Sequence, residues 1–264
     1  MGDAGAPLPA DFTRFTAGRA EVVCATHLAL MFREIVPRIT IYEYAAHHPQ
    51  GRALAGRGTA YAVPLPTDVD HIVVRHNRHG GLLAPLTRDL FRPPTRAPLE
   101  LRLSHKLIEH GVPTPVMLAY VVYPAPFGFC RVDVVTREVP NSFDLAVAFT
   151  SDDEALRAQA IAATTDLVVA LSAVGAHHAD LNIKNVLLHS PRGDGTLEAM
   201  VLDLDRIRFD EPEIVFDWNL ERLLRSARKW REERGARVTQ AELDELAGSV
   251  RERRPPPVPD NTSA

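Results

Sequence analysis

Three oxygen-bearing side chains in the second half of the sequence have the types and order needed to hold a divalent cation beside a hydroxyl group. The stretch HADLNIKN, residues 178–185, places Asp180 five residues before Asn185, directly ahead of an apolar run. Asp203 follows at the end of the next expected strand, in VLDLD. Asp180 can accept a hydrogen bond from an attacking hydroxyl, and Asn185 and Asp203 offer oxygens that suit Mg²⁺. This chemistry favours phosphoryl transfer, which depends mainly on positioning and charge neutralisation.

The elements expected around this loop change in type along the chain. Apolar periodicity, caps and Gly or Pro breaks predict helices at about residues 21–36, 95–111, 154–174 and 217–234. Strands are predicted at about residues 38–46, 71–76, 116–123, 128–136, 185–189 and 198–205. SDDE, residues 151–154, is interpreted as a capping box, and Gly175 as the end of the helix that it opens.

A strand-rich first half followed by a helix-rich second half predicts an α+β, two-lobed fold with a boundary near Pro140. We expect a loosely ordered N-terminus over residues 1–20 and a strand-rich N-lobe over residues 21–139. A helical C-lobe over residues 140–250 and a disordered tail over residues 251–264 complete the expected organisation.

Composition excludes several classes of protein. The net charge of −4 argues against a nucleic-acid-binding protein, which would usually be basic. Two isolated cysteines offer neither a disulfide framework nor a zinc site. The first residues lack the basic start and apolar core of a secretory signal, and no apolar run reaches the length of a membrane span. The cytoplasm is therefore the expected compartment.

HADLNIKN resembles the loop H-R-D-L-x-x-x-N of protein-kinase-like phosphotransferases, and DLD, residues 203–205, stands where they carry D-F-G. Together with RHNRHGG, residues 75–81, and NLERLLRSARK, residues 219–229, these motifs are similar to those of the bacterial 3-deoxy-D-manno-octulosonic acid (Kdo) kinases. The resemblance runs from about residue 52 to residue 231. It implies a bilobal protein-kinase-like fold and ATP-dependent phosphorylation of a Kdo hydroxyl, the 4-hydroxyl in this family, on a lipid A precursor.

The resemblance also implies roles for single residues. Asp180 would be the catalytic aspartate, and Asn185 and Asp203 the Mg²⁺ ligands. Arg75 would take the place of the strand lysine that contacts the phosphates of ATP, with Arg78 as a competitor, and Glu100 would pair with it. Arginine keeps the charge of that lysine but replaces a point charge with a planar fork.

The remaining nucleotide contacts are implied in the same way. Gly56 and Gly58 would begin the glycine-rich loop over the phosphates, although Tyr61 replaces its third glycine. Residues 136–139, which include Glu138, would form the hinge whose backbone meets adenine. His178 is expected to shape the loop from the core. Asp217 and Trp218 resemble an anchoring aspartate and a core aromatic residue beneath it.

The helix at residues 217–234 is rich in basic groups whose role the sequence leaves open. They form either a solvated face or contacts with an acidic acceptor, and the candidates for the second role are Arg222, Arg225, Arg228, Lys229 and Arg231, with Arg206 and Arg208 placed at least as well. Basic groups also favour peripheral contact with the anionic cytoplasmic face of the inner membrane. The expected partners are therefore ATP and a lipid-linked Kdo acceptor, without nucleic acid or an obligate protein partner.

Two other functions stay open at this point. One is a phosphotransferase of the same fold that acts on heptose, an aminoglycoside or protein serine. The short stretch expected after residue 235 leaves little room for a protein-substrate platform. The other is a non-catalytic pseudokinase that serves as a binding module, against which the intact set of Asp180, Asn185 and Asp203 argues.

Overall fold

The computed structural model describes residues 8–54, 60–65, 71–78 and 89–254. The chain divides into two compact units. The first comprises residues 1–106 and 115–138, and the second comprises residues 107–114 and 139–264. The short segment 107–114 belongs to the second unit because it bonds to a strand there: Thr114 Oγ1 donates to the carbonyl of Val201 at 2.9 Å, and the Val201 amide donates to the carbonyl of Pro113 at 3.0 Å.

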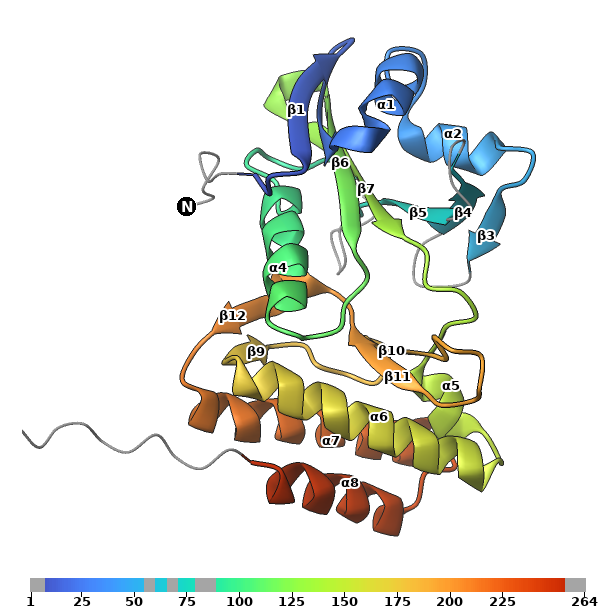
Figure 1. The fold of residues 1–264 in the computed structure, drawn as a ribbon, viewed down its shortest axis with the longest axis vertical. Helices are drawn as coiled ribbons and strands as arrows, with labels where there is room; N and C mark the ends of the chain where they lie inside the picture. Colours follow the sequence, from blue (N-terminus) through green and yellow to red (C-terminus); the bar gives the residue numbers. More distant parts are fainter. Residues whose placement is uncertain (1–7, 55–59, 66–70, 79–88, 255–264) are drawn as a thin grey trace, which may run out of the picture. The chain divides into compact units, whose positions relative to one another are not determined.

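The first unit is built on one antiparallel sheet of seven strands in the order β1-β2-β6-β7-β5-β4-β3 (Figure 1). The strands are β1 Phe12–Ala17, β2 Ala20–Ala25, β3 Arg52–Leu54, β4 Ala60–Pro64, β5 His71–His76, β6 Met117–Pro124 and β7 Cys130–Arg137. The strands predicted at residues 71–76, 116–123 and 128–136 are confirmed. Their β-branched residues fill the core, where Val74, Val134 and Val135 are fully buried.

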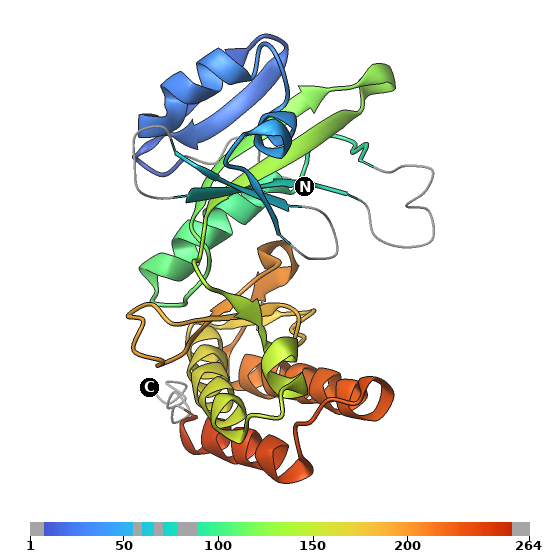
Figure 2. The same ribbon diagram turned by 90° about the vertical axis from the view of Figure 1, so that its right-hand side faces the viewer.

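Helix α4, Ala97–Glu109, packs against this sheet (Figure 2). Its Ala97 and Leu101 belong to the same buried apolar cluster as the strands. Ser104 links it to β6, because its hydroxyl donates to the carbonyl of Pro115 at 3.2 Å and accepts from the amide of Met117 at 3.0 Å. Gly111 follows the helix with φ of +75°, the left-handed conformation expected of a glycine after a helix end.

The prediction for the first 36 residues is wrong in two places. Residues 12–17 form β1 rather than a loosely ordered segment, and residues 20–25 form β2 rather than a helix. Residues 22–25 of β2 are all buried, and because successive side chains of a strand point to opposite faces, both faces of this strand are covered. A strand buried on both faces loses the apolar–polar alternation that identifies strands in a sequence. Helical structure begins with the 3₁₀ turn η1, Thr26–Leu28, and α1, Ala29–Ile35.

The strand predicted at residues 38–46 is also wrong, because residues Ile41–His47 form helix α2. A capping box opens it: Thr40 Oγ1 accepts from the Glu43 amide at 3.1 Å, and Glu43 accepts from the Thr40 amide at 3.0 Å. These bonds satisfy two backbone donors that a helix start leaves unpaired. The β-branched and aromatic residues of ITIYEY concealed this T-x-x-E signal.

The second unit is mainly helical, and α6 packs against both α7 and α8 (Figure 1). Its helices are α5 Leu145–Thr150, α6 Glu154–Ala173, α7 Pro212–Arg234 and α8 Gln240–Glu252. Strands β8 Phe143–Asp144, β10 Val186–His189 and β11 Glu198–Val201 form one sheet, and β9 Ala176–His178 pairs with β12 Ile207–Phe209. The long helices predicted before and after the loop are confirmed, and the α+β fold class with them.

Four details of this unit differ from the sequence predictions. Asp153, not Ser151, caps α6, and its carboxylate accepts from the amides of Ala155 and Leu156. Helix α7 begins at Pro212, five residues earlier than expected, because proline fits the first turn of a helix. Strand β11 ends at Val201 instead of residue 205. Helix α8 follows residue 235, where the sequence predicted no helix, and residues 251–252 belong to it rather than to a disordered tail.

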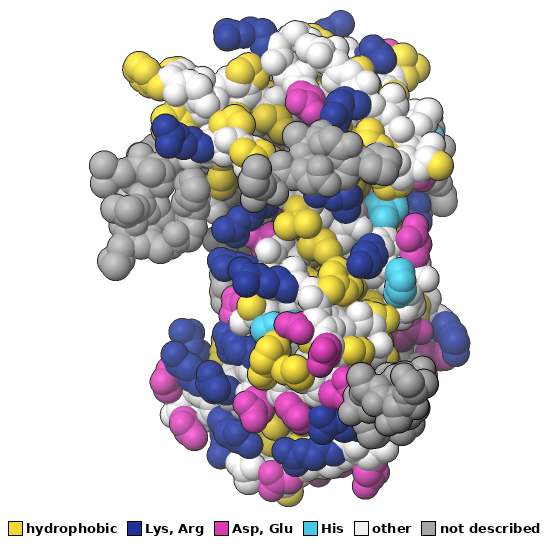
Figure 3. Space-filling model, turned by 90° about the vertical axis from the view of Figure 1, so that its left-hand side faces the viewer, with side chains coloured by type: hydrophobic (Ala, Val, Ile, Leu, Met, Phe, Trp, Pro, Cys, Tyr) yellow, Lys and Arg dark blue, Asp and Glu magenta, His cyan; other side chains and the backbone are white. Residues whose placement is uncertain are grey.

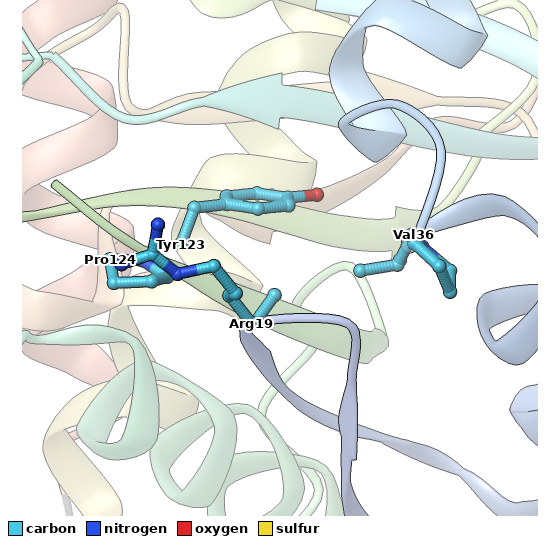
Figure 4. Close-up of a pocket in the computed structure, with 6 residues that line it drawn as sticks. Arg19, Val36, Tyr123 and Pro124 are labelled. Carbon is cyan, nitrogen blue, oxygen red and sulfur yellow. The ribbon is translucent and has the colours of Figure 1, made fainter.

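A pocket of about 250 Å³ opens on the first unit beside the turn between β1 and β2 (Figure 4). Its walls come from Arg19, Val36, Tyr123 and three neighbouring residues. None of the candidate site residues lines it. The pocket is therefore distinct from the candidate residues, three of which lie in and after the loop that follows β9.

Candidate active site

Two antiparallel strand pairs bring the loop at residues 179–185 next to the segment at residues 202–206. Strand β9 enters the loop and pairs with β12, while β10 leaves it and pairs with β11. Backbone bonds extend both pairings: the Leu202 amide donates to the Asn185 carbonyl at 2.9 Å, and the Ala179 amide donates to the Arg206 carbonyl at 3.2 Å. The two stretches that carry the candidate residues are thus joined at both ends.

His178 sits at the centre of this arrangement and is fully buried. Its Nδ1 accepts from the Asp180 amide at 3.2 Å, so the ring proton lies on Nε2, which donates to the Leu202 carbonyl at 2.8 Å. Burial lowers the pKa of His178 below its ordinary value, so the ring is neutral near pH 7. With both ring nitrogens occupied, His178 holds the loop against the segment before Asp203, which agrees with the structural role expected from the sequence.

Asn182 and Asn185 both brace the backbone of Asp180. Their side-chain amides donate to the Asp180 carbonyl at 3.0 Å and 2.9 Å. Asn182 also accepts from the Lys184 amide at 2.9 Å, which completes a tight turn. Because Asn185 uses its nitrogen toward Asp180, its Oδ1 is oriented away from that bond, as a cation ligand requires.

Asp203 adopts a backbone conformation that is uncommon for a residue with a side chain. Its φ of 57° and ψ of 53° are left-handed, and its side chain makes no capping bond to the 3₁₀ turn η3, Leu204–Arg206, that follows. Such conformations cluster at functional sites and cost about 1–3 kcal/mol. The exposed Asp203 carboxylate directly follows Leu202, which bonds both His178 and Asn185.

The carboxylate of Asp180 forms an ion pair whose basic partner could not be chosen from the sequence. Arg222 of α7 donates from Nη2 to Asp180 Oδ1 at 2.5 Å. Arg222 was one of several basic residues singled out on this helix, and only the fold shows which of them reaches the loop. Figure 3 shows Lys and Arg side chains interspersed with Asp and Glu over the helical part of one face, as a solvated surface would be.

The residue that anchors the loop to α7 is Asn219, and the interpretation of Asp217 as the anchor is wrong. Asn219 is fully buried, accepts from the His178 amide at 3.0 Å and donates to the Ala176 carbonyl at 3.0 Å. Asp217 is exposed and pairs with Arg254 at 3.2 Å. Trp218 is no core residue either, since 42% of it is exposed and it packs beside the His177 ring.

In the first unit, the structure joins the two residues expected to hold the phosphates. Arg75, in β5, donates from Nη2 to Glu100 Oε1 of α4 at 2.6 Å. The arginine side chain remains 38% exposed, whereas that of Glu100 is 14% exposed. Glu100 therefore holds the guanidinium from the protein side, while the arginine side chain as a whole stays partly exposed. Arg78 lies just beyond the end of β5 and is exposed.

The expected adenine contact at Glu138 is only partly compatible with the structure. Its backbone amide already donates to the His71 carbonyl at 2.8 Å, and its carboxylate is bound by Arg52. The Glu138 amide is thus committed within the sheet. Gly56 and Gly58, expected over the phosphates, lie outside the described residues.

A second cluster of ionisable groups surrounds His76, at the end of β5. Its Nδ1 lies 2.5 Å from a carboxylate oxygen of the fully buried Asp133, and its Nε2 lies 3.1 Å from Asp89, which Arg131 also binds. Burial alone would lower the pKa of His76, but the bonds and charges of the two aspartates outweigh it and raise the pKa above 6.5. The cluster links β5, β7 and the start of α2, where the Tyr42 amide donates to Asp133.

Comparisons with known proteins find one matching family and several similar kinases. The model of the lipopolysaccharide kinase (Kdo/WaaP) family matches residues 49–247. A 3-deoxy-D-manno-octulosonic acid kinase of Xylella fastidiosa (strain M12) is 31% identical over 198 residues, covering 72% of this chain and 74% of that protein. One from Vibrio parahaemolyticus is 31% identical over 202 residues, covering 71% of this chain and 79% of that protein.

A solved structure agrees at the level of the fold. The structure of WaaP in complex with acyl carrier protein matches with a TM-score of 0.52 and 20% sequence identity. The match covers 85% of this chain and 87% of the WaaP chain. The protein-kinase-like fold expected from the sequence is thereby confirmed.

Proposed function

The chain belongs to the lipopolysaccharide kinase (Kdo/WaaP) family, and on that premise we propose that it transfers the γ-phosphoryl group of ATP to a hydroxyl of a Kdo residue on a lipid A precursor. The family makes it a kinase of the lipopolysaccharide core. The acceptor sugar, its 4-hydroxyl and the lipid carrier are the proposed part. The braced backbone of Asp180, on a loop tied to the segment before Asp203, is the observation that carries the proposal.

Asp180 is proposed to orient and deprotonate the acceptor hydroxyl. Two side-chain amides fix its backbone, and its carboxylate is partly exposed, with Oδ1 bound to Arg222. A carboxylate held in this way can accept the hydroxyl proton as the acceptor oxygen bonds to the γ-phosphorus and ADP leaves. His178 is neutral and occupied on both nitrogens, which leaves this role to Asp180.

The donor set after β9 fits a hard divalent cation, for which we propose Mg²⁺. Asn185 directs its amide nitrogen to the protein, which frees Oδ1, and Asp203 offers a carboxylate without a capping bond. Among the described residues there is no cluster of three His, Cys, Asp or Glu that would make a closed metal cage. Mg²⁺ commonly takes one or two protein oxygens and completes its shell with phosphate and water. When bound, it neutralises charge on the phosphates.

Arg75 and Glu100 are proposed to hold the phosphates of ATP. The ion pair keeps a guanidinium at a fixed position on β5, on a side chain that is 38% exposed. A planar guanidinium binds phosphate oxygens through paired hydrogen bonds. Arg78 stays a competitor for this contact. At Glu138 we retain only the backbone carbonyl as an adenine contact, because its amide is bonded to His71.

The site of action is proposed to be the cytoplasmic face of the inner membrane, where a lipid-linked acceptor would be presented. No helix among the described residues has the length and apolar character needed to span a bilayer. The related WaaP structure contains acyl carrier protein. That partner gives a reason to test acyl carrier protein with this chain as well, beside our expectation of no obligate protein partner.

The proposal is tested by ATP turnover with three acceptors: a Kdo-bearing lipid A precursor, a heptosylated core and an aminoglycoside. We expect turnover above the acceptor-free rate with the first alone. Turnover only with heptose or an aminoglycoside would move the chain to another acceptor within the same fold. ATP binding without turnover on any acceptor would favour the pseudokinase alternative.

A further inference from the structure

Arg222 lies against the carboxylate that the proposed function uses as the base. The guanidinium donates to one oxygen of Asp180, and both side chains keep contact with solvent, 31% exposed for Arg222 and 37% for Asp180. A hydroxyl group that approaches Asp180 from solvent therefore arrives beside a positive charge. The protein supplies this cation at the point where the acceptor must bind.

The position of Arg222 is fixed by the same helix that fixes the loop. Its neighbours Leu220, Leu223 and Leu224 are almost fully buried and hold α7 in the core of the second unit. Asn219, one turn before Arg222, bonds the backbone of β9 at His178. Arg222 is therefore held by a packed helix, which is a more precise support for a binding residue than a loop.

Arginine offers more charge and more hydrogen-bond donors at this contact than are needed to orient the Asp180 carboxylate. A neutral amide could hold one oxygen of a carboxylate in place, whereas arginine brings a full charge and five N–H donors in a planar fork. The contact with Asp180 joins Nη2 of Arg222 to Oδ1. The remaining donors of the fork suit a second, planar anion such as a carboxylate.

We propose that Arg222 is a specificity-determining residue that binds the carboxylate of the acceptor sugar acid and so places its hydroxyl beside Asp180. This inference rests on the proposed function and deepens it. Acceptors without an acidic group, such as a neutral sugar, gain nothing from Arg222, and cationic acceptors are repelled by it. In the transfer step the hydroxyl proton passes to Asp180, the oxygen bonds to the γ-phosphorus, the bond to ADP breaks, and Arg222 keeps its protons.

The test is a cycle that changes the protein and the acceptor together. The two enzymes are the wild type and Arg222→Gln, and the two acceptors are a Kdo-bearing lipid A precursor and its carboxylate methyl ester. For the wild type we expect esterification to lower kcat/KM by about 10- to 100-fold, the factor that corresponds to a hydrogen bond between charged groups. For Arg222→Gln we expect low kcat/KM with both acceptors and a ratio between them close to one.

Arg234→Gln is the matched control, since it removes one positive charge from the exposed end of the same helix. It should keep the wild-type ratio between acid and ester. ATP binding, measured for each variant, shows that the fold is retained. A wild type that accepts acid and ester equally well, or an Arg222→Gln variant that still discriminates between them, overturns the inference while the proposed function stands. A wild type that phosphorylates neither acceptor overturns both.

Discussion

Asn219 provides the sharpest test of how the candidate active site is held together. Replacing it with leucine keeps the size of the side chain but removes its acceptor for the His178 amide and its donor for the Ala176 carbonyl, at 3.0 Å each. Both backbone groups would stay buried without a partner. Each such group costs about 1–3 kcal/mol, so the free energy of unfolding should fall by about 2–6 kcal/mol. Because Asp180 follows His178 by two residues, kcat should fall as well.

Urea unfolding and kcat measured on the same preparations provide the assay. Asp217→Ala is the control two residues earlier on α7, where an exposed ion pair with Arg254 is worth at most about 1 kcal/mol. Asn219→Asp keeps the acceptor for His178 and should lie between wild type and Asn219→Leu. The reasoning is refuted if Asn219→Leu is as stable and active as wild type. It is also refuted if Asp217→Ala lowers the free energy of unfolding more than Asn219→Leu does.

Three further perturbations test other parts of the molecule. The substitution His76→Gln removes the imidazolium and should lower the free energy of unfolding most below pH 6.5. Because the pKa of His76 is raised in the folded protein, the difference from wild type in urea unfolding should shrink as the pH rises through that pKa. A difference that stays constant with pH would contradict this. The substitution Arg157→Met breaks a largely buried ion pair with Glu242 of α8 and should lower the free energy of unfolding by about 3–5 kcal/mol, measured by thermal unfolding. A change below about 1 kcal/mol would mean that α8 docks without this ion pair. Gly175→Ala should impair expression and folding, since a Cβ there would lie 2.2 Å from the carbonyl oxygen of Asp210; normal yield would show that the turn can shift.

Secondary structure was predicted best from the sequence where a local sequence rule agrees with the tertiary fold. Gly175 ends α6 as expected, with φ of +66°, and the run HIVVRH is strand β5 to the residue. The kinase-like loop was found because Asp180 and Asn185 are close in sequence, and their order is tied to the chemistry. Motifs of this kind can be recognised in a sequence without knowledge of the tertiary structure.

The failures have physical causes in tertiary structure. Strand β2 is buried on both faces, so its apolar run looks like part of a helix. The aromatic residues of α2 have strand propensity, but the capping box at Thr40 decides in favour of a helix. Asn219 and Asp217 lie two residues apart on α7, and only the direction in which each side chain points separates anchor from surface.

Arg222 shows the same limit at the candidate active site. Helix α7 carries several basic residues between positions 222 and 231, and nothing in their spacing identifies the one that contacts Asp180. That contact spans 42 positions in the sequence and depends on how α7 packs beneath the loop. Arg75 and Glu100, 25 positions apart, were paired only through the resemblance to kinases.

The most direct test of the central claim is the mass of the acceptor after reaction with ATP and Mg²⁺. With the wild type, a Kdo-bearing lipid A precursor should gain about 80 Da, one phosphoryl group, on the sugar. Asp180→Asn keeps the shape of the side chain but not the base, so it should bind ATP while product formation falls by about 10²- to 10⁴-fold. An unmodified acceptor with the wild type, or full product with Asp180→Asn, would contradict the account.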